Sequence, residues 1–98
     1  MNVLMIRAKV KEENVADTEA ATKKIIQALE RAQPDVHYGV TRLSDGVTVV
    51  AFLEMEPGQE HPLLGFPEYQ ELLENLKGWY AEPPTVENMT VIGSYQLF

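Results

Sequence analysis

Residues 36–55 read VHYGVTRLSDGVTVVAFLEM, and this stretch decides the fold. Both halves are rich in β-branched and aromatic residues, which favour strands. Between them lies Asp45-Gly46, a strong signal for a two-residue hairpin turn, in which both positions need a positive φ. The stretch therefore predicts two antiparallel strands, from Val36 to Ser44 and from Val47 to Met55.

A two-residue turn also fixes which residues lie opposite each other, and directly opposed residues share a face of the sheet. One set is mostly apolar, and we expect it to face a layer of helices: Arg42 with Val49, Val40 with Ala51, Tyr38 with Leu53 and Val36 with Met55. The other set is mixed, and we expect it on the open face: Leu43 with Thr48, Thr41 with Val50, Gly39 with Phe52 and His37 with Glu54. A slip of one residue would break this pairing.

The flanking sequence supplies two more strands and two helices. Val3–Val10 alternates like a strand, and about Glu13–Ala32 carries an apolar stripe at helical spacing, with Pro34 just past its end. A second amphipathic helix begins at Pro67, and Val86–Leu97 is typical of a final strand. Pro57-Gly58 ends the second hairpin arm, Gln59–Phe66 forms a loop, Gly78 is a candidate cap of the second helix, and Pro83-Pro84 cannot continue it.

The order strand–helix–strand–strand–helix–strand predicts an α+β, ferredoxin-like domain over residues 1–98: a four-stranded antiparallel sheet with two helices on one face. Alternation places Met5 and Arg7 of the first strand, and Asn88, Thr90 and Ile92 of the last, on the open face. That face would expose a large apolar patch on a monomer, made of Val3, Met5, Leu43, Val50, Phe52 and Ile92. We therefore expect a homodimer joined through this face, with a partly polar cavity between the sheets.

Composition excludes several classes of function. The chain has 8 basic and 15 acidic residues, a net charge of −7, and no cluster of Lys and Arg that would bind a phosphate backbone, so we expect no nucleic acid. No run approaches the roughly 18 apolar residues of a membrane span, and residues 1–7 lack the basic region and the small-residue cleavage site of a signal peptide. There are no cysteines, and the two histidines lack carboxylates at ligand spacing, which leaves a metal site unsupported. We expect a cytoplasmic protein.

The element order, the strand end Phe52-Leu53-Glu54-Met55-Glu56 and the helix start Phe66-Pro67-Glu68-Tyr69 resemble the dimeric α/β-barrel superfamily. More closely, they resemble the antibiotic-biosynthesis monooxygenase-like domains. The resemblance covers nearly the whole chain and implies a homodimeric barrel around a ligand cavity. The family includes cofactor-independent oxygenases of polyphenolic polyketides, quinol oxygenases, haem-degrading enzymes and many members with no assigned activity.

The resemblance suggests some site residues and argues against others. Certain oxygenases of this type carry an Asn and a Trp four residues apart on the second helix, a spacing matched by Asn75 and Trp79, which would share a helix face. Many members have a His just before the aromatic residue at the start of that helix, where this chain has Glu68 before Tyr69. Haem degraders place a His after the helical Trp, and here none follows His61, which argues against haem degradation.

His37 opposite Glu54 is the leading candidate site, because a carboxylate beside an imidazole orients the ring and makes it a usable base. An ordinary cross-strand ion pair explains the same pairing. Asn75, Trp79 and Tyr80 would position an aromatic substrate, or would pack as core if Gly78 ends the helix. Arg7 would hold an anionic substrate or balance nearby glutamates, and Phe52 would cover Gly39 or face a ligand. His61 is expected to be a solvent-exposed loop residue.

These residues support a working hypothesis and two alternatives. The hypothesis is a cofactor-independent monooxygenase that acts on a small aromatic or quinol-type substrate, in which His37 removes a phenolic proton while Asn75 and Trp79 orient the ring. The first alternative is a non-catalytic small-molecule-binding or regulatory dimer of the same fold, favoured by the missing His at the helix start. The second is a purely structural interaction module.

Overall fold

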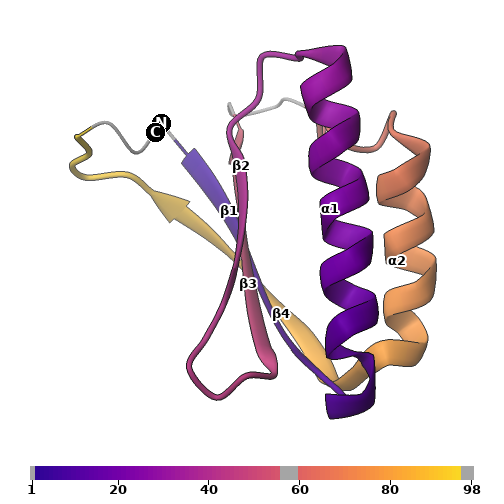
Figure 1. Cartoon of the computed structure of the whole chain (residues 1–98). Helices are drawn as coiled ribbons and strands as arrows, with labels where there is room; N and C mark the ends of the chain where they lie inside the picture. The colour runs from indigo at the N-terminus through magenta and orange to yellow at the C-terminus, as the bar shows by residue number, and fades with distance from the viewer. Residues whose placement is uncertain (1, 56–59, 96–98) are drawn as a thin grey trace.

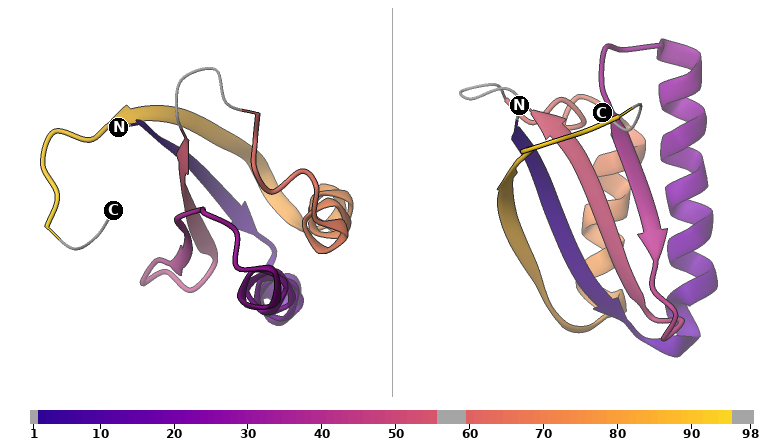
Figure 2. Two further views of the ribbon diagram at one scale, coloured as in Figure 1. Left: turned by 90° about the horizontal axis from the view of Figure 1, so that it is seen from above. Right: turned by 90° about the vertical axis from the view of Figure 1, so that its left-hand side faces the viewer.

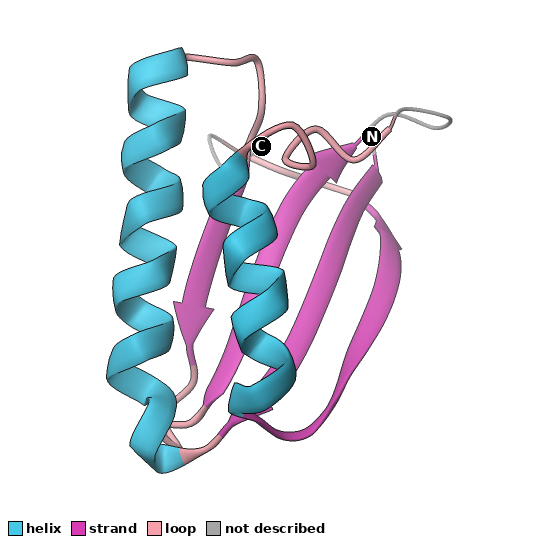
Figure 3. Cartoon of the chain, turned by 90° about the vertical axis from the view of Figure 1, so that its right-hand side faces the viewer, coloured by secondary structure: helices cyan, strands magenta, loops and turns pink. Residues whose placement is uncertain are grey.

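The computed structural model describes residues 2–55 and 60–95 and arranges them in two layers (Figure 1). The elements are β1 (Asn2–Val10), a 3₁₀ turn (Glu12–Asn14), α1 (Val15–Ala32), β2 (Tyr38–Arg42), β3 (Thr48–Met55), α2 (Pro67–Trp79) and β4 (Tyr80–Thr90). The sheet is antiparallel with the order β2-β3-β1-β4, and both helices cover the same face (Figure 3). The predicted α+β, ferredoxin-like arrangement is confirmed. The predicted turn at Pro57-Gly58 and the predicted strand end at Gln96-Leu97 lie outside the described residues.

The hairpin has the predicted register, from the pair Tyr38–Leu53 to the pair Arg42–Val49. Its turn is built differently from the prediction. Gly46 supplies a positive φ of 81°, but Asp45 acts through its carboxylate, which accepts from the backbone N–H of Val47 at 3.0 Å and of Thr48 at 2.8 Å. These bonds hold the turn that sets the register, and therefore decide which side chains of β2 and β3 face the helices.

The two helices end in different ways. After α1, Gln33 adopts a left-handed conformation with φ 50° and its N–H bonds to the carbonyl of Leu29, as expected just before Pro34. The second helix continues through Gly78 to Trp79, so the predicted cap at Gly78 is wrong. Lys11 explains this, because its backbone N–H bonds to the carbonyl of Trp79 (2.9 Å) and its Nζ to the carbonyl of Gly78 (3.0 Å). Both carbonyls would otherwise end the helix without partners.

The last strand differs from its prediction in both extent and register. It begins at Tyr80, directly after α2, and includes Pro83-Pro84, which an edge strand tolerates because one side of its backbone has no strand partner. Val3 pairs with Met89, Met5 with Glu87 and Arg7 with Thr85, so these β4 residues share the open face. Asn88 and Thr90 pair with Leu4 and Asn2 on the helix side, and Ile92 lies beyond β4. The predicted open-face placement of Asn88 and Thr90 is wrong, and Ile92 is not part of the strand.

The core lies between the sheet and the helices. Its buried members come from both layers and from the loop before α2: Ile25, Leu53, Leu63, Tyr69 and Leu72. On the opposite face the sheet is bare of helices, and the segment after β4 leaves the sheet on that side (Figure 2). The expected apolar patch there is smaller than predicted, because Val3 (1% exposed) and Val50 (7%) are already buried in the single chain. Val3 is on a central strand, where Glu54 and Met89 flank it from either side.

Candidate functional site

A cavity of about 70 Å³ lies between the sheet and the helices. Most of its wall is aliphatic, from the inward faces of β1, β2 and β3 and from the leucines of α2. Its polar groups are few and consist of one imidazole, three phenols and two threonine hydroxyls: His61, Tyr38, Tyr69, Tyr80, Thr18 and Thr22. An apolar enclosure with a few convergent polar groups is the usual form of a small-molecule site.

The centre of this group is a contact between His61 and Tyr69. Nε2 of His61 lies 3.2 Å from the hydroxyl oxygen of Tyr69, and the two rings are 5.0 Å apart at an angle of 30°. The backbone N–H of Leu63 donates to Nδ1 of His61 at 3.3 Å, so Nδ1 is the unprotonated nitrogen. In the neutral ring Nε2 then carries the proton and donates it to Tyr69. The hydroxyl proton of Tyr69 is left free for a ligand.

The loop before α2 holds His61 in this position. Leu63 is fully buried, and the N–H groups of Leu64 and Phe66 bond to the carbonyls of His61 (3.2 Å) and Leu63 (3.0 Å). Pro67 then starts α2 and places Tyr69 in its first turn. The loop and the helix start are thus tied to each other before any ligand is bound.

Burial sets the charge state of the cavity groups. Desolvation lowers the pKa of His61 below 6.5, so its ring is neutral at pH 7. The pKa of Tyr69 is raised above 10 by burial and then by the nearby Tyr80, whose own pKa is also raised by burial. Burial, and then Tyr69, raise the pKa of Tyr38 well above its usual value. All three phenols remain protonated and are available as hydrogen-bond donors.

His61 is the residue that the sequence analysis missed. It was expected in solvent, but it is half-buried against Tyr69 and lines the cavity. The chain has Glu68 where the resemblance implies a His before the helical aromatic, and His61 brings an imidazole to that aromatic from the loop instead. The signal available was a histidine eight residues before Tyr69, directly before Pro62 in the short segment that leads to Pro67.

Four of the predicted site residues lie together on the open face. Nε2 of His37 is 3.9 Å from Oε2 of Glu54, an ion-pair distance too long for a hydrogen bond. The His37 side chain is 58% exposed and that of Glu54 17%, and Oε2 of Glu54 is buried without a hydrogen-bond partner among the described residues. His37 and Phe52 line a broad hollow of about 610 Å³ with Met89. Arg7 is exposed on the same face, opposite Val50.

Asn75 and Trp79 lie in a different place. Because α2 continues to Trp79, the two residues do share a helix face, and both line a groove of about 190 Å³ against α1. Tyr80 lines the interior cavity. The three residues predicted to be catalytic are therefore not brought together, since His37 lies on the open face and Asn75 and Trp79 lie in the helix layer.

Neither a metal site nor a membrane-spanning helix is found in the part of the chain that the structure describes. Residues 2–55 and 60–95 hold no group of three His, Asp or Glu side chains that could bind a metal ion. In the same residues, no helix has the length and apolar character needed to cross a membrane.

Comparison with solved structures agrees with this architecture. A protein of Nitrosomonas europaea, provisionally named an antibiotic biosynthesis monooxygenase, is 16% identical, with a TM-score of 0.78 over 95% of this chain and 100% of that one. A variant of SnoaB, a cofactor-independent oxygenase from Streptomyces nogalater, is 15% identical, with a TM-score of 0.70 over 97% of this chain and 96% of that one. No family model and no curated protein sequence matches the chain. The likeness establishes the fold, which is that of antibiotic biosynthesis monooxygenase-like domains.

Proposed function

We propose that this protein is a cofactor-independent monooxygenase that acts on a phenol or hydroquinone bound between the sheet and the helices. The observation that carries the proposal is the His61–Tyr69 pair on a largely apolar cavity between the sheet and the helices. The likeness in fold to a cofactor-independent oxygenase supports it. The proposal moves the chemistry from His37, the predicted base, to the opposite side of the sheet.

The cavity groups suit the demands of this chemistry. A phenol reacts with oxygen as its phenolate. Because His61 and Tyr69 both act as donors here, the phenolic proton leaves to water as the substrate binds, and the site has to stabilise the negative oxygen that remains. A donor that stays protonated in a dry site does this, and Tyr69 has a raised pKa and a proton free for a ligand. His61 fixes that hydroxyl by donating to its oxygen.

The electrons come from the substrate itself. A hydroquinone that reacts with one O₂ becomes a hydroxyquinone and releases one water, so one oxygen atom enters the ring and the other leaves reduced. The role left to the chain is to bind the ring, stabilise its anion and exclude water. The aliphatic walls and His61, from the loop before α2, border the space in which the ring would lie.

Oxygen uptake with a panel of hydroquinones and phenols tests the proposal. Tyr69→Phe removes the donor but keeps the ring, and should lower kcat/KM by about a hundredfold, the effect of losing one oxyanion donor. His61→Gln should also lower it. His37→Gln is the matched comparison, because it removes the histidine on the other face. If oxygen uptake persisted in Tyr69→Phe and was lost in His37→Gln, the active site would be on the open face instead. If no substrate gave any uptake, the proposed oxygenase would be rejected.

A non-catalytic small-molecule-binding or regulatory role is the second candidate. It is favoured by the sequence, which has Glu68 where the resemblance implies a His before the helical aromatic. Retention of a small molecule in native mass spectrometry without any oxygen uptake would select this role.

We also infer that two copies pair through the open face of the sheet. The hollow beside Phe52 and Met89 is far larger than the interior cavity, and Leu43 on the same face is exposed. Beyond β4, the segment that leaves the sheet on this side carries Ile92, which is fully exposed (Figure 2). A second copy would cover these apolar groups.

A further inference from the structure

A second hollow adjoins the interior cavity at the edge of the sheet. A hollow of about 190 Å³ lies between α1 and β2, and it shares five wall residues with the interior cavity: Val10, Thr18, Thr22, Val40 and Val49. The two spaces therefore adjoin along the same wall. We call the outer one the α1–β2 mouth, with Glu19, Lys23 and Arg42 as its charged residues.

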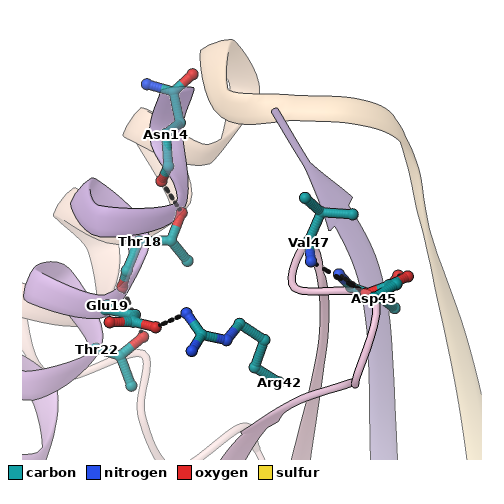
Figure 4. Close-up of polar contacts among 8 residues, drawn as sticks. Asn14, Thr18, Glu19, Thr22, Arg42, Asp45 and Val47 are labelled. Carbon is teal, nitrogen blue, oxygen red and sulfur yellow. Dashed lines mark hydrogen bonds and ion pairs between the residues drawn. The ribbon is translucent and has the colours of Figure 1, made fainter. Parts of the chain in front are cut away.

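The charges of the mouth are arranged around an ion pair. The guanidinium of Arg42 on β2 pairs with the carboxylate of Glu19 on α1, and both side chains remain about half-exposed (Figure 4). Lys23 lies one helical turn after Glu19 and has no ion-pair partner among the described residues. Two of the eight basic residues in a chain of net charge −7 thus meet at one opening with a single carboxylate between them.

The neutral polar groups of the mouth add no donors. The hydroxyl of Thr18 donates to the carbonyl of Asn14 at 2.8 Å, and that of Thr22 to the carbonyl of Thr18 at 2.9 Å (Figure 4). Their protons are used within α1, and the remaining wall is largely aliphatic. A ligand at the mouth therefore meets a largely aliphatic wall and two cationic donors, which suits an anion on an apolar body.

We propose that the α1–β2 mouth binds the carboxylate of an elongated aromatic acid whose ring system extends from the mouth into the interior cavity. Without a ligand, the guanidinium of Arg42 pairs with the carboxylate of Glu19. The carboxylate of the ligand replaces that of Glu19, so one ion pair of Arg42 is exchanged for another. The identity of the ring end as a phenol rests on the proposed function. The carboxylate end rests on the mouth alone.

The length of the ligand follows from the strand. Arg42 and Tyr38 both belong to the helix-facing set of β2, and they are four residues apart, about 13 Å at roughly 3.3 Å per residue. Tyr38 lines the interior cavity with Tyr69. A single ring with a carboxylate is too short to reach from Arg42 to these phenols, whereas a molecule of two or more fused rings spans more of the distance.

The experiment compares 6-hydroxy-2-naphthoate with 2-naphthol, which lacks the carboxylate, by fluorescence titration. Arg42→Gln should weaken binding of the naphthoate by about tenfold, the effect of losing one charge-assisted hydrogen bond, and leave 2-naphthol unchanged. Glu19→Gln frees Arg42 and should tighten the naphthoate. Lys24→Gln is the control, since it removes a neighbouring positive charge of α1 that lines the groove against α2.

Arg42→Gln is expected to weaken binding of the naphthoate and Glu19→Gln to strengthen it. These opposite effects on affinity distinguish a binding role of the ion pair from a purely structural one. If the ion pair only holds α1 to the edge strand, both variants lower the melting temperature and neither tightens the naphthoate, and that result overturns the inference. Equal affinity for naphthoate and naphthol, or no binding of the naphthoate, overturns it too. The titration measures binding and does not depend on turnover. If the variants changed binding as predicted but the protein took up no oxygen, the proposed oxygenase would be rejected and the carboxylate site at the mouth would be supported.

Discussion

Two consecutive residues of β3 show how differently the two faces of the sheet are used. Leu53 points toward the helices and is 2% exposed, within a core that also contains Ile25 and Leu72. Phe52 points the other way, is only partly buried, and borders the hollow of about 610 Å³. The helix side is packed around a small cavity that holds neutral polar groups, whereas the open side has no layer of helices over it. The difference teaches that stability and a candidate site share one face, and that the other face is left for a partner.

The largest expected effect tests this contrast directly. Leu53→Ala removes a fully packed side chain and leaves a void, so it should lower the free energy of unfolding by about 3 kcal/mol. Phe52→Ala, one residue away, should cost less in the monomer, about 1 kcal/mol, because its ring is only partly buried. Urea unfolding at a protein concentration low enough to keep the chain monomeric measures both. Equal losses would mean that the open face is as tightly packed as the core.

The second prediction breaks the proposed dimer. Phe52→Lys places a charge on the open face. A two-fold interface would bury this charge once from each copy, so the dissociation constant of the dimer should rise by about thirtyfold. Val86→Lys is the control, because Val86 is 57% exposed and pairs with Ile6 on the other face. Sedimentation equilibrium measures the dissociation constant of the dimer for both variants. A wild-type chain that stays monomeric at high concentration, or a control that dissociates equally, would contradict the dimer.

The sequence predicted the hairpin well because its register is local. Asp45-Gly46 fixes the pairing from within four residues, and every pair that the structure shows in this hairpin agrees with it. The last strand has no such anchor. Its pairing with β1 depends on contacts distant in sequence, and it is shifted by irregularities near Lys9, so alternation alone assigned Asn88 to the wrong face.

The candidate site was harder to predict for the same reason. His37 and Glu54 were paired correctly, because the hairpin register brings them together. The contact of His61 with Tyr69 depends instead on how a loop folds back on the helix that follows it, and no periodicity records that. The extension of α2 past Gly78 likewise depends on Lys11, which is 67 residues away in sequence.

The smallest expected effect concerns the charge state of the buried histidine. Burial lowers the pKa of His61 in the folded protein, so the unfolded chain binds the proton first as the pH falls through about 6.5. Stability from the neutral ring is complete above that pH, declines below it, and levels off once the folded protein is also protonated. His61→Gln should therefore reduce the slope of unfolding free energy against pH between about 7 and 5, by less than one proton. Urea unfolding at several pH values measures the slopes, with Tyr69→Phe as the variant that keeps the imidazole. If His61→Gln steepened the slope, the folded protein would be binding the proton more readily than the unfolded chain, and the neutral His61 on which the donor role of Tyr69 depends would be lost.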